Sequence, residues 1–110
     1  MSLSTTVSHS AFIRATAGRS AELGLRLERL LEPSRHTPGC LHFSLAHSQC
    51  DDDLWLVIGF WANQPAMAAW FNSPVMQVFD GLVTDRLVNS LDFQTFTAIQ
   101  AQGSLHQLAS

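Results

Sequence analysis

Residues 54–61, LWLVIGFW, are apolar along their whole length, and this run constrains the fold more than any other segment. The run is short for a helix, and as a strand it would point apolar side chains to both faces of a sheet. Strands of this kind lie in the interior of a sheet and are covered on both faces. We therefore predict a central strand at 54–61.

Three other segments predict further strands. Residues 7–15, 40–47 and 90–99 place side chains of similar character at every second position, which is the period of a strand. The polar run 48–53 joins the second of these strands to 54–61 as a hairpin. The predicted faces are Val7, His9, Ala11, Ile13 and Ala15 in the first strand, Leu41, Phe43 and Leu45 in the second, and Leu91, Phe93, Thr95 and Thr97 in the last. The opposite face of the second strand is expected to hold Cys40, His42, Ser44 and Ala46.

Two regions between the strands follow the helical period instead. Leucines recur at i, i+4, i+7 and i+8 in 20–31, and Pro33 and the pair Pro38-Gly39 are expected to end that helical segment. A helix at 64–72 begins directly after Asn63, a residue type that caps helix N-termini, and carries a proline in its first turn. A second short helix is expected at 75–83.

The resulting order, β-α-β-β-α-β, is that of the ferredoxin-like α+β fold, with a four-stranded antiparallel sheet and helices on one face. The other sheet face then needs a cover. Because 46% of the 110 residues are hydrophobic and only 14% are charged, a second copy of the sheet is the simplest cover, and we expect a two-fold symmetric homodimer. We expect one domain over residues 1–110, with its core at about 7–99 and a tail at 100–110 that is either flexible or lies on the partner subunit.

Composition argues against several classes of partner. The net charge is -3 and no basic patch is visible, so we expect no nucleic-acid partner. No apolar run approaches the ~20 residues of a membrane span, and no signal peptide is visible, so we expect a cytoplasmic protein. Cys40 and Cys50 are then expected to be reduced thiols. The five histidines show no metal-binding spacing, so we expect no metal.

The passage FWANQPAMAAWFNSP, with Trp61, Ala66, Ser73 and Pro74, and the segment PSRHTPGCL before the second strand resemble the antibiotic biosynthesis monooxygenase (ABM) family of dimeric α/β barrels. The resemblance covers residues 7–98. It implies that dioxygen oxidises a small aromatic or quinone-type substrate without metal, flavin or other cofactor, because the substrate itself is the reductant. The protein would supply a base, hydrogen bonds to the substrate anion and a dry pocket.

The chain departs from the family pattern at two positions. Members usually carry an acidic residue two positions before the tryptophan that ends the strand, and a histidine in the helix that follows. This chain has Gly59 and Trp70 there, and we predict that the Trp70 indole fills the space that Gly59 leaves. Haem-degrading members use an Asn, a Trp and a His where this chain has Ala11, Trp70 and Asp80, so haem is not expected.

Six residues are candidates for the site. His9 and His42 are the candidate bases, because an imidazole titrates near neutral pH. Their strands are expected beside the centre of the sheet, where the two side chains can meet on one face. The favoured alternative is a histidine that is hydrogen-bonded at a subunit interface. Trp61 and Trp70 either hold an aromatic substrate or are core residues. Trp55 shares the strand parity of Trp61 and is a candidate for the same pocket.

Asn63 is first a helix cap, and its amide is also a candidate contact to substrate at the pocket mouth. Two functions remain open. One is a cofactor-independent monooxygenase that acts on a small aromatic molecule. The other is a non-catalytic, small-molecule-binding or stress-related dimer whose pocket is partly filled by Trp70, and the loss of the acid–histidine pair favours this second function.

Overall fold

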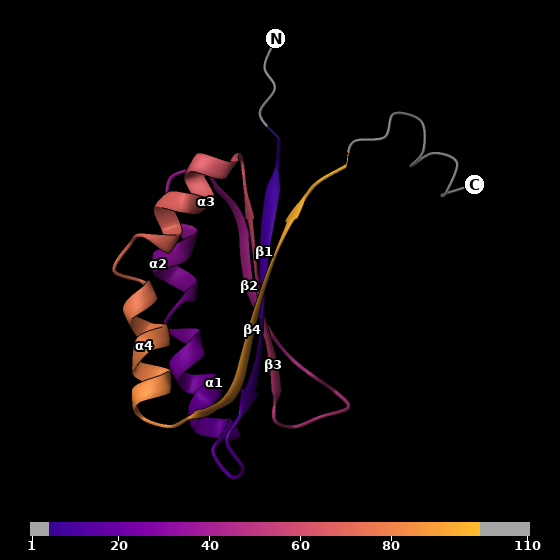
Figure 1. Cartoon of the computed structure of the whole chain (residues 1–110), viewed down its shortest axis with the longest axis vertical. Coiled ribbons are helices and arrows are strands. Elements are labelled where there is room, and N and C mark those ends of the chain that lie inside the picture. The colour runs from indigo at the N-terminus through magenta and orange to yellow at the C-terminus, as the bar shows by residue number, and fades with distance from the viewer. Residues whose placement is uncertain (1–4, 100–110) are drawn as a thin grey trace, which may run out of the picture.

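The computed structural model of the chain describes residues 5–99, and the expected tail at 100–110 lies outside them. The helices and strands follow the predicted order on a ferredoxin-like fold (Figure 1). They are β1 (Val7–Ala15), α1 (Ser20–Glu28), α2 (Leu31–Arg35), β2 (Cys40–His47), β3 (Leu54–Trp61), α3 (Gln64–Phe71), α4 (Met76–Thr84) and β4 (Val88–Thr97).

The four strands form one antiparallel sheet in the order β2-β3-β1-β4. The prediction that 54–61 is an internal strand is confirmed, because β3 lies between β2 and β1. β1 is internal as well, and β2 and β4 are the two edges. β4 begins and ends two residues earlier than the predicted strand 90–99.

The core lies between the sheet and the helices. The residues predicted to share one face of β1 are all buried there, as the alternation indicates. The helices meet them with buried side chains that include Leu23, Leu27, Trp70, Phe79 and Leu82. Figure 1 shows α3 at the end of the sheet where β1 begins, and α1 at the other end beside the β2–β3 turn.

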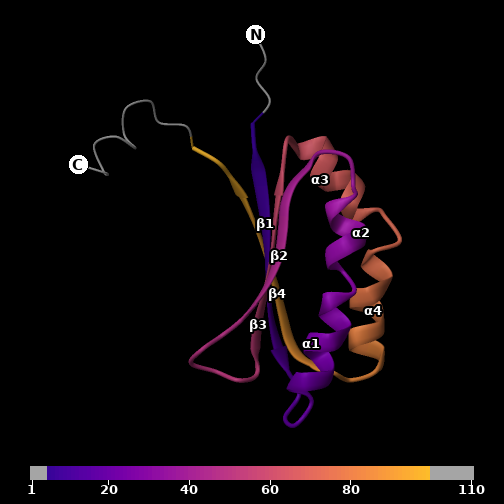
Figure 2. The ribbon, with the colours of Figure 1, turned by 180° about the vertical axis from the view of Figure 1, so that it is seen from behind.

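The opposite sheet face carries no helix within the described residues (Figure 2). Several large apolar side chains lie on it, and Phe12 and Phe60 are each 39% exposed while Phe96 is 53% exposed. An apolar sheet face of this kind needs a cover, which is the reasoning that predicts a dimer.

The first helical region differs from the prediction. α1 ends at Glu28, and a separate short helix, α2, runs through Pro33. The expectation that Pro33 ends the helix was wrong because this proline occupies the first turn of α2. In the first turn of a helix a backbone N–H has no intrahelical partner, so a proline, which lacks the N–H, does not destabilise the helix there.

Gly24 lies in the middle of α1, where glycine lowers helix propensity by roughly 1 kcal/mol relative to alanine. The structure explains it. A Cβ atom at Gly24 would lie 2.5 Å from Cη2 and 2.7 Å from Cζ2 of Trp55. The indole therefore packs directly on the helix backbone, and this contact joins α1 to β3.

Candidate functional site

His9 occupies the middle of the helix-covered face. It lies on the internal strand β1, with Gly59 of β3 and Thr95 of β4 as its partners in the register. The side chain is 0% exposed. The rings around it have centroids at 5.2 Å (Trp70), 4.8 Å (Phe71) and 5.0 Å (Phe93) from the imidazole centroid. His9 is thus enclosed by aromatic side chains.

The polar atoms of His9 are unsatisfied. Neither ring nitrogen has a hydrogen-bond partner among residues 5–99. Burial lowers the pKa of His9 to about 4, because an imidazolium here would lose its contact with water. His9 is therefore neutral near pH 7, with one N–H donor and one nitrogen acceptor available. Buried polar groups are nearly always paired, so these two nitrogens are an unusual feature of this core.

Trp61 and Trp70 lie side by side next to this histidine. Both are fully buried, and their ring centroids are 5.5 Å apart. The Trp70 Nε1–H donates to Oγ of the buried Ser34 at 2.8 Å. The Trp61 Nε1–H has no partner within the described part of the chain. Trp70 is therefore fixed in place, whereas Trp61 keeps an unused donor.

The predicted partnership of Gly59 and Trp70 was wrong in its detail. A Cβ atom at Gly59 would meet Cδ2 of Phe43 at 3.0 Å and Nε1 of Trp61 at 3.1 Å. These two side chains take the space beside Gly59 because they come from its own strand and the adjacent one. Trp70 lies against both rings at 5.5 Å. Trp70 thus fills the interior, but not the gap at Gly59.

The enclosure of His9 is thinnest toward β4. Residues 92–97 of this edge strand are all exposed, and Phe93 is 38% exposed although its ring contacts His9. A hollow of about 70 Å³ adjoins this place, and its lining includes Val7, Met67 and Thr95. The hollow lies between α3 and β4, next to Thr95, which is the register partner of His9.

His42 does not join His9. It pairs with Phe60 on the opposite sheet face, at a ring-centroid distance of 6.0 Å, and it is exposed. The expectation that the two histidines meet was wrong for two reasons. β3 separates their strands, and a register shift between Cys40 and His42 leaves Phe43 on the helix side. Adjacent residues of a strand point to opposite faces, so His42 faces away.

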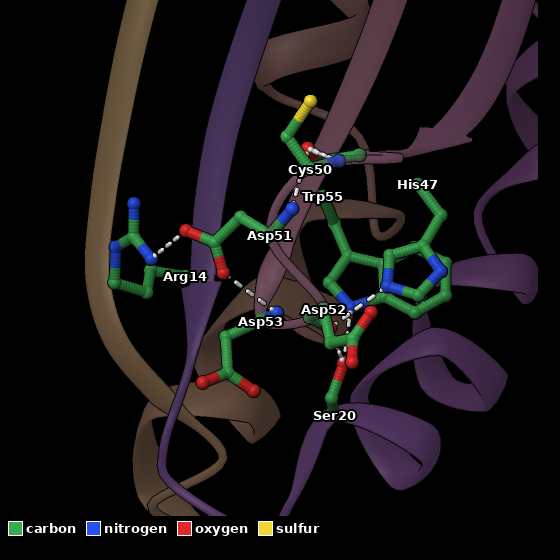
Figure 3. A network of polar contacts seen from close by, with 9 residues as sticks. Arg14, Ser20, His47, Cys50, Asp51, Asp52, Asp53 and Trp55 are labelled. Atoms are coloured by element: carbon green, nitrogen blue, oxygen red, sulfur yellow. Dashed lines mark hydrogen bonds and ion pairs between the residues drawn. The ribbon is translucent and has the colours of Figure 1, made fainter.

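Trp55 lies at the other end of β3 from Trp61. Figure 3 shows it beside His47 and Ser20. Its ring stacks on His47 at 3.9 Å, and its Nε1–H donates to Oγ of Ser20 at 2.9 Å. The Ser20 hydroxyl and the His47 imidazole both reach the backbone oxygen of Asp52. Trp55 therefore ties the β2–β3 turn to α1 and is not one of the rings around His9.

Asn63 caps α3. Its Oδ1 accepts a hydrogen bond from the backbone N–H of Ala66 at 2.9 Å, which confirms the predicted cap. A contact between Asn63 and a ligand stays a prediction.

The described residues also bear on metal binding, thiol chemistry and membrane insertion. Within residues 5–99, no three His, Cys, Asp or Glu side chains are grouped so as to hold a metal ion. Cys40 and Cys50 are free thiols, and burial raises the pKa of the Cys40 thiol. No helix of the described chain has the length and apolar character to cross a membrane.

Three residues of the site were not identified from sequence. Phe93 was placed on the correct strand face beside Thr95, so its position was available from the alternation. Phe71 follows Trp70 at the end of α3, with no periodic signal that marks it. Ser34 lies in a segment that was not predicted to be helical, and nothing in the sequence links it to Trp70.

This chain is similar to known proteins in both sequence and structure. The family model for antibiotic biosynthesis monooxygenases matches residues 6–81. A Deinococcus radiodurans protein provisionally named an antibiotic biosynthesis monooxygenase is 26% identical, with a TM-score of 0.77 over 87% of this chain and 94% of that chain. A variant of SnoaB, a cofactor-independent oxygenase from Streptomyces nogalater, is 18% identical, with a TM-score of 0.75 over 90% and 98%. A Synechocystis protein is 25% identical over 75 residues, which are 68% of this chain and 51% of that protein, so the chain spans about half the length of this relative.

Proposed function

Because this chain belongs to the antibiotic biosynthesis monooxygenase family, we propose that it is a cofactor-independent monooxygenase that oxidises a small aromatic or quinone-type molecule with dioxygen. SnoaB, which has the same fold, is named a cofactor-independent oxygenase. The observation that carries the proposal is the buried, neutral imidazole of His9 without a described hydrogen-bond partner, enclosed by aromatic rings.

His9 is the proposed base. With menadiol as a model substrate, a neutral imidazole nitrogen takes the proton of the hydroxyl group farther from the methyl group, and the adjacent C–H carbon of the same ring becomes electron-rich. This carbon bonds to dioxygen, and the proton returned by His9 completes a hydroperoxide beside a carbonyl. Loss of the remaining hydrogen on that carbon, with cleavage of the O–O bond, releases water and leaves a second carbonyl. One menadiol and one dioxygen thus give one hydroxynaphthoquinone and one water, and the substrate supplies all the electrons.

The low pKa of His9 in the free protein is compatible with a role as base, because a substrate anion beside the imidazole changes that pKa. In the free protein the imidazolium has no charged partner, so His9 is a weak base. A phenolate formed beside it supplies the opposite charge in a site that excludes water. That attraction raises the pKa of His9 for as long as the ion pair exists. Proton transfer is therefore coupled to the presence of a substrate.

The aromatic rings supply the rest of the site. Trp70 offers an apolar face next to His9, and the unused indole N–H of Trp61 is a donor for a substrate oxygen. In such a dry environment a hydrogen bond to a developing oxyanion is stronger than in water. The two tryptophans are thus assigned to hold and polarise the ring.

The protein is proposed to act as a cytoplasmic homodimer with one domain per chain. A second copy placed on the uncovered sheet face would bury Phe12, Phe60 and Phe96, each more than a third exposed. The free thiols Cys40 and Cys50 fit a reducing compartment.

Oxygen uptake tests the proposed reaction. Wild type is mixed with menadiol in an oxygen electrode, and the rate is corrected for spontaneous oxidation. We expect enzyme-dependent uptake that falls by about a hundredfold or more in His9→Leu, since a general base contributes that much. The control His36→Gln changes an exposed histidine and is expected to keep the wild-type rate. Absence of enzyme-dependent uptake with wild type would contradict the proposal.

The second candidate, a non-catalytic binding protein, is favoured by one observation. Trp70 is fully buried and held by Ser34, so it occupies the space beside His9. The two functions can be distinguished by measuring the binding of menadione under nitrogen, with tryptophan fluorescence as the signal. If Trp70 holds the ring, Trp70→Ala weakens binding. If Trp70 is a plug, Trp70→Ala strengthens binding, and wild type shows no turnover.

A further inference from the structure

Phe93 stands between solvent and His9. It lies on the exposed edge strand β4 and is itself 38% exposed, while His9 behind it is 0% exposed. The two rings meet edge to face, with their centroids 5.0 Å apart and an angle of 84° between their planes. The Phe93 ring also contacts the rings of Phe79 and Phe71, with centroid distances of 5.4 Å and 6.4 Å. These contacts hold it over the imidazole with no polar anchor.

The other sides of His9 are closed by residues that are held more firmly. The sheet backbone lies beneath it, and Trp70 is fixed by the hydrogen bond to Ser34. Phe43 and Trp61, whose rings contact Trp70, are fully buried. A side chain on an uncovered edge strand moves more easily than these. Access to His9 therefore depends on Phe93.

We propose that Phe93 admits substrate to His9 and limits the substrate to one or two fused aromatic rings; this rests on the proposed function, because it names the substrate class of the same site. When Phe93 turns outward it vacates the volume of one phenyl ring. The adjoining hollow of about 70 Å³ extends that volume toward Thr95 and Met67. We therefore expect the site to take a bicyclic ring such as menadiol in preference to the three-ring anthrone.

Chemical labelling of His9 tests access without requiring turnover. Diethyl pyrocarbonate modifies neutral imidazoles, and peptide mass spectrometry gives the rate for each histidine. The exposed His36 and His42 serve as internal standards. We expect the His9 rate to rise about tenfold or more in Phe93→Ala, because the lost aromatic contacts kept the site closed. Gln94→Ala is the matched control, since Gln94 lies on β4 next to Phe93 but faces the other way, and among residues 5–99 its side chain bonds only to Asp92. It should leave the His9 rate unchanged.

Two results of the labelling would overturn the role of Phe93. One is an unchanged His9 rate in Phe93→Ala. The other is an equal rise in Phe93→Ala and Gln94→Ala, which would show a general loosening of β4. Phe93→Leu provides a second variant that keeps apolar packing if the alanine variant does not fold, and it should give an intermediate rate.

Substrate choice tests the size limit. Anthrone and dioxygen give anthraquinone and water, so oxygen uptake can be compared for the two ring sizes. Wild type should prefer menadiol, and Phe93→Ala should raise kcat/KM for anthrone about tenfold relative to menadiol. An unchanged preference in Phe93→Ala refutes the size limit while the oxygenase stands. No turnover of either compound refutes the proposed function and the substrate class, whereas the labelling still decides whether Phe93 controls access.

Discussion

His9 makes the stability of the fold depend on pH in a way that can be calculated. The imidazole has a pKa of 6.5 when unperturbed, and burial lowers the pKa of His9 to about 4 in the folded protein. Between these values the unfolded chain binds the proton and the folded protein does not. The free energy of unfolding therefore falls as the pH drops through this window, and the contribution of His9 is fully present above the unfolded pKa.

The size of the effect follows from the two pKa values. Over the whole titration, from 6.5 to about 4, His9 removes roughly 3 kcal/mol of stability, because each pKa unit corresponds to about 1.4 kcal/mol. Between about pH 7.5 and about pH 5, the loss is about 2 kcal/mol. That is a large part of the stability of a small domain.

Urea unfolding of wild type and His9→Leu, at one protein concentration and several pH values, measures the effect. All other titrating groups are common to both proteins, so the difference between their free energies of unfolding isolates His9. We expect His9→Leu to gain about 2 kcal/mol relative to wild type between about pH 7.5 and about pH 5. A difference that stays constant with pH would refute the buried, neutral state of His9.

Three further outcomes can be measured. Gly24→Ala should lower the free energy of unfolding by about 1–3 kcal/mol despite its better helix propensity, because the new Cβ would overlap Trp55. Gly81→Ala is the control and should be neutral or stabilising, because only the end of the flexible Arg26 side chain lies 3.0 Å from its new Cβ. Ser34→Ala should cost about 1–3 kcal/mol in urea unfolding, because it leaves the buried N–H of Trp70 without its acceptor; unchanged stability would show that this bond is not formed. Sedimentation at micromolar concentration should give a dimer, and a stable monomer would contradict the proposed cover of the apolar sheet face.

The strands could be predicted from sequence because their side chains follow a simple period. LWLVIGFW gave the internal strand β3, and the alternation in VSHSAFIRA placed His9 correctly on the buried face. The cap at Asn63 could also be predicted, since it depends only on the residues next to it.

The site could be predicted only in part, because its geometry depends on contacts between distant segments. The position of His42 followed from strand order and a register shift at Cys40, neither of which alternation reveals. The anchoring of Trp70 depends on Ser34, which lies 36 positions away in the chain. A packing contact across the core has no local signature in sequence, so the partner of Gly24 could not be named either.

Mass spectrometry of the product formed from menadiol under isotopically heavy dioxygen tests the proposed reaction most directly. With wild type we expect a hydroxynaphthoquinone that carries one heavy oxygen atom, and with His9→Leu we expect this product to be lost. Formation of unlabelled menadione and hydrogen peroxide alone, at the same rate with and without the protein, would contradict the proposed reaction.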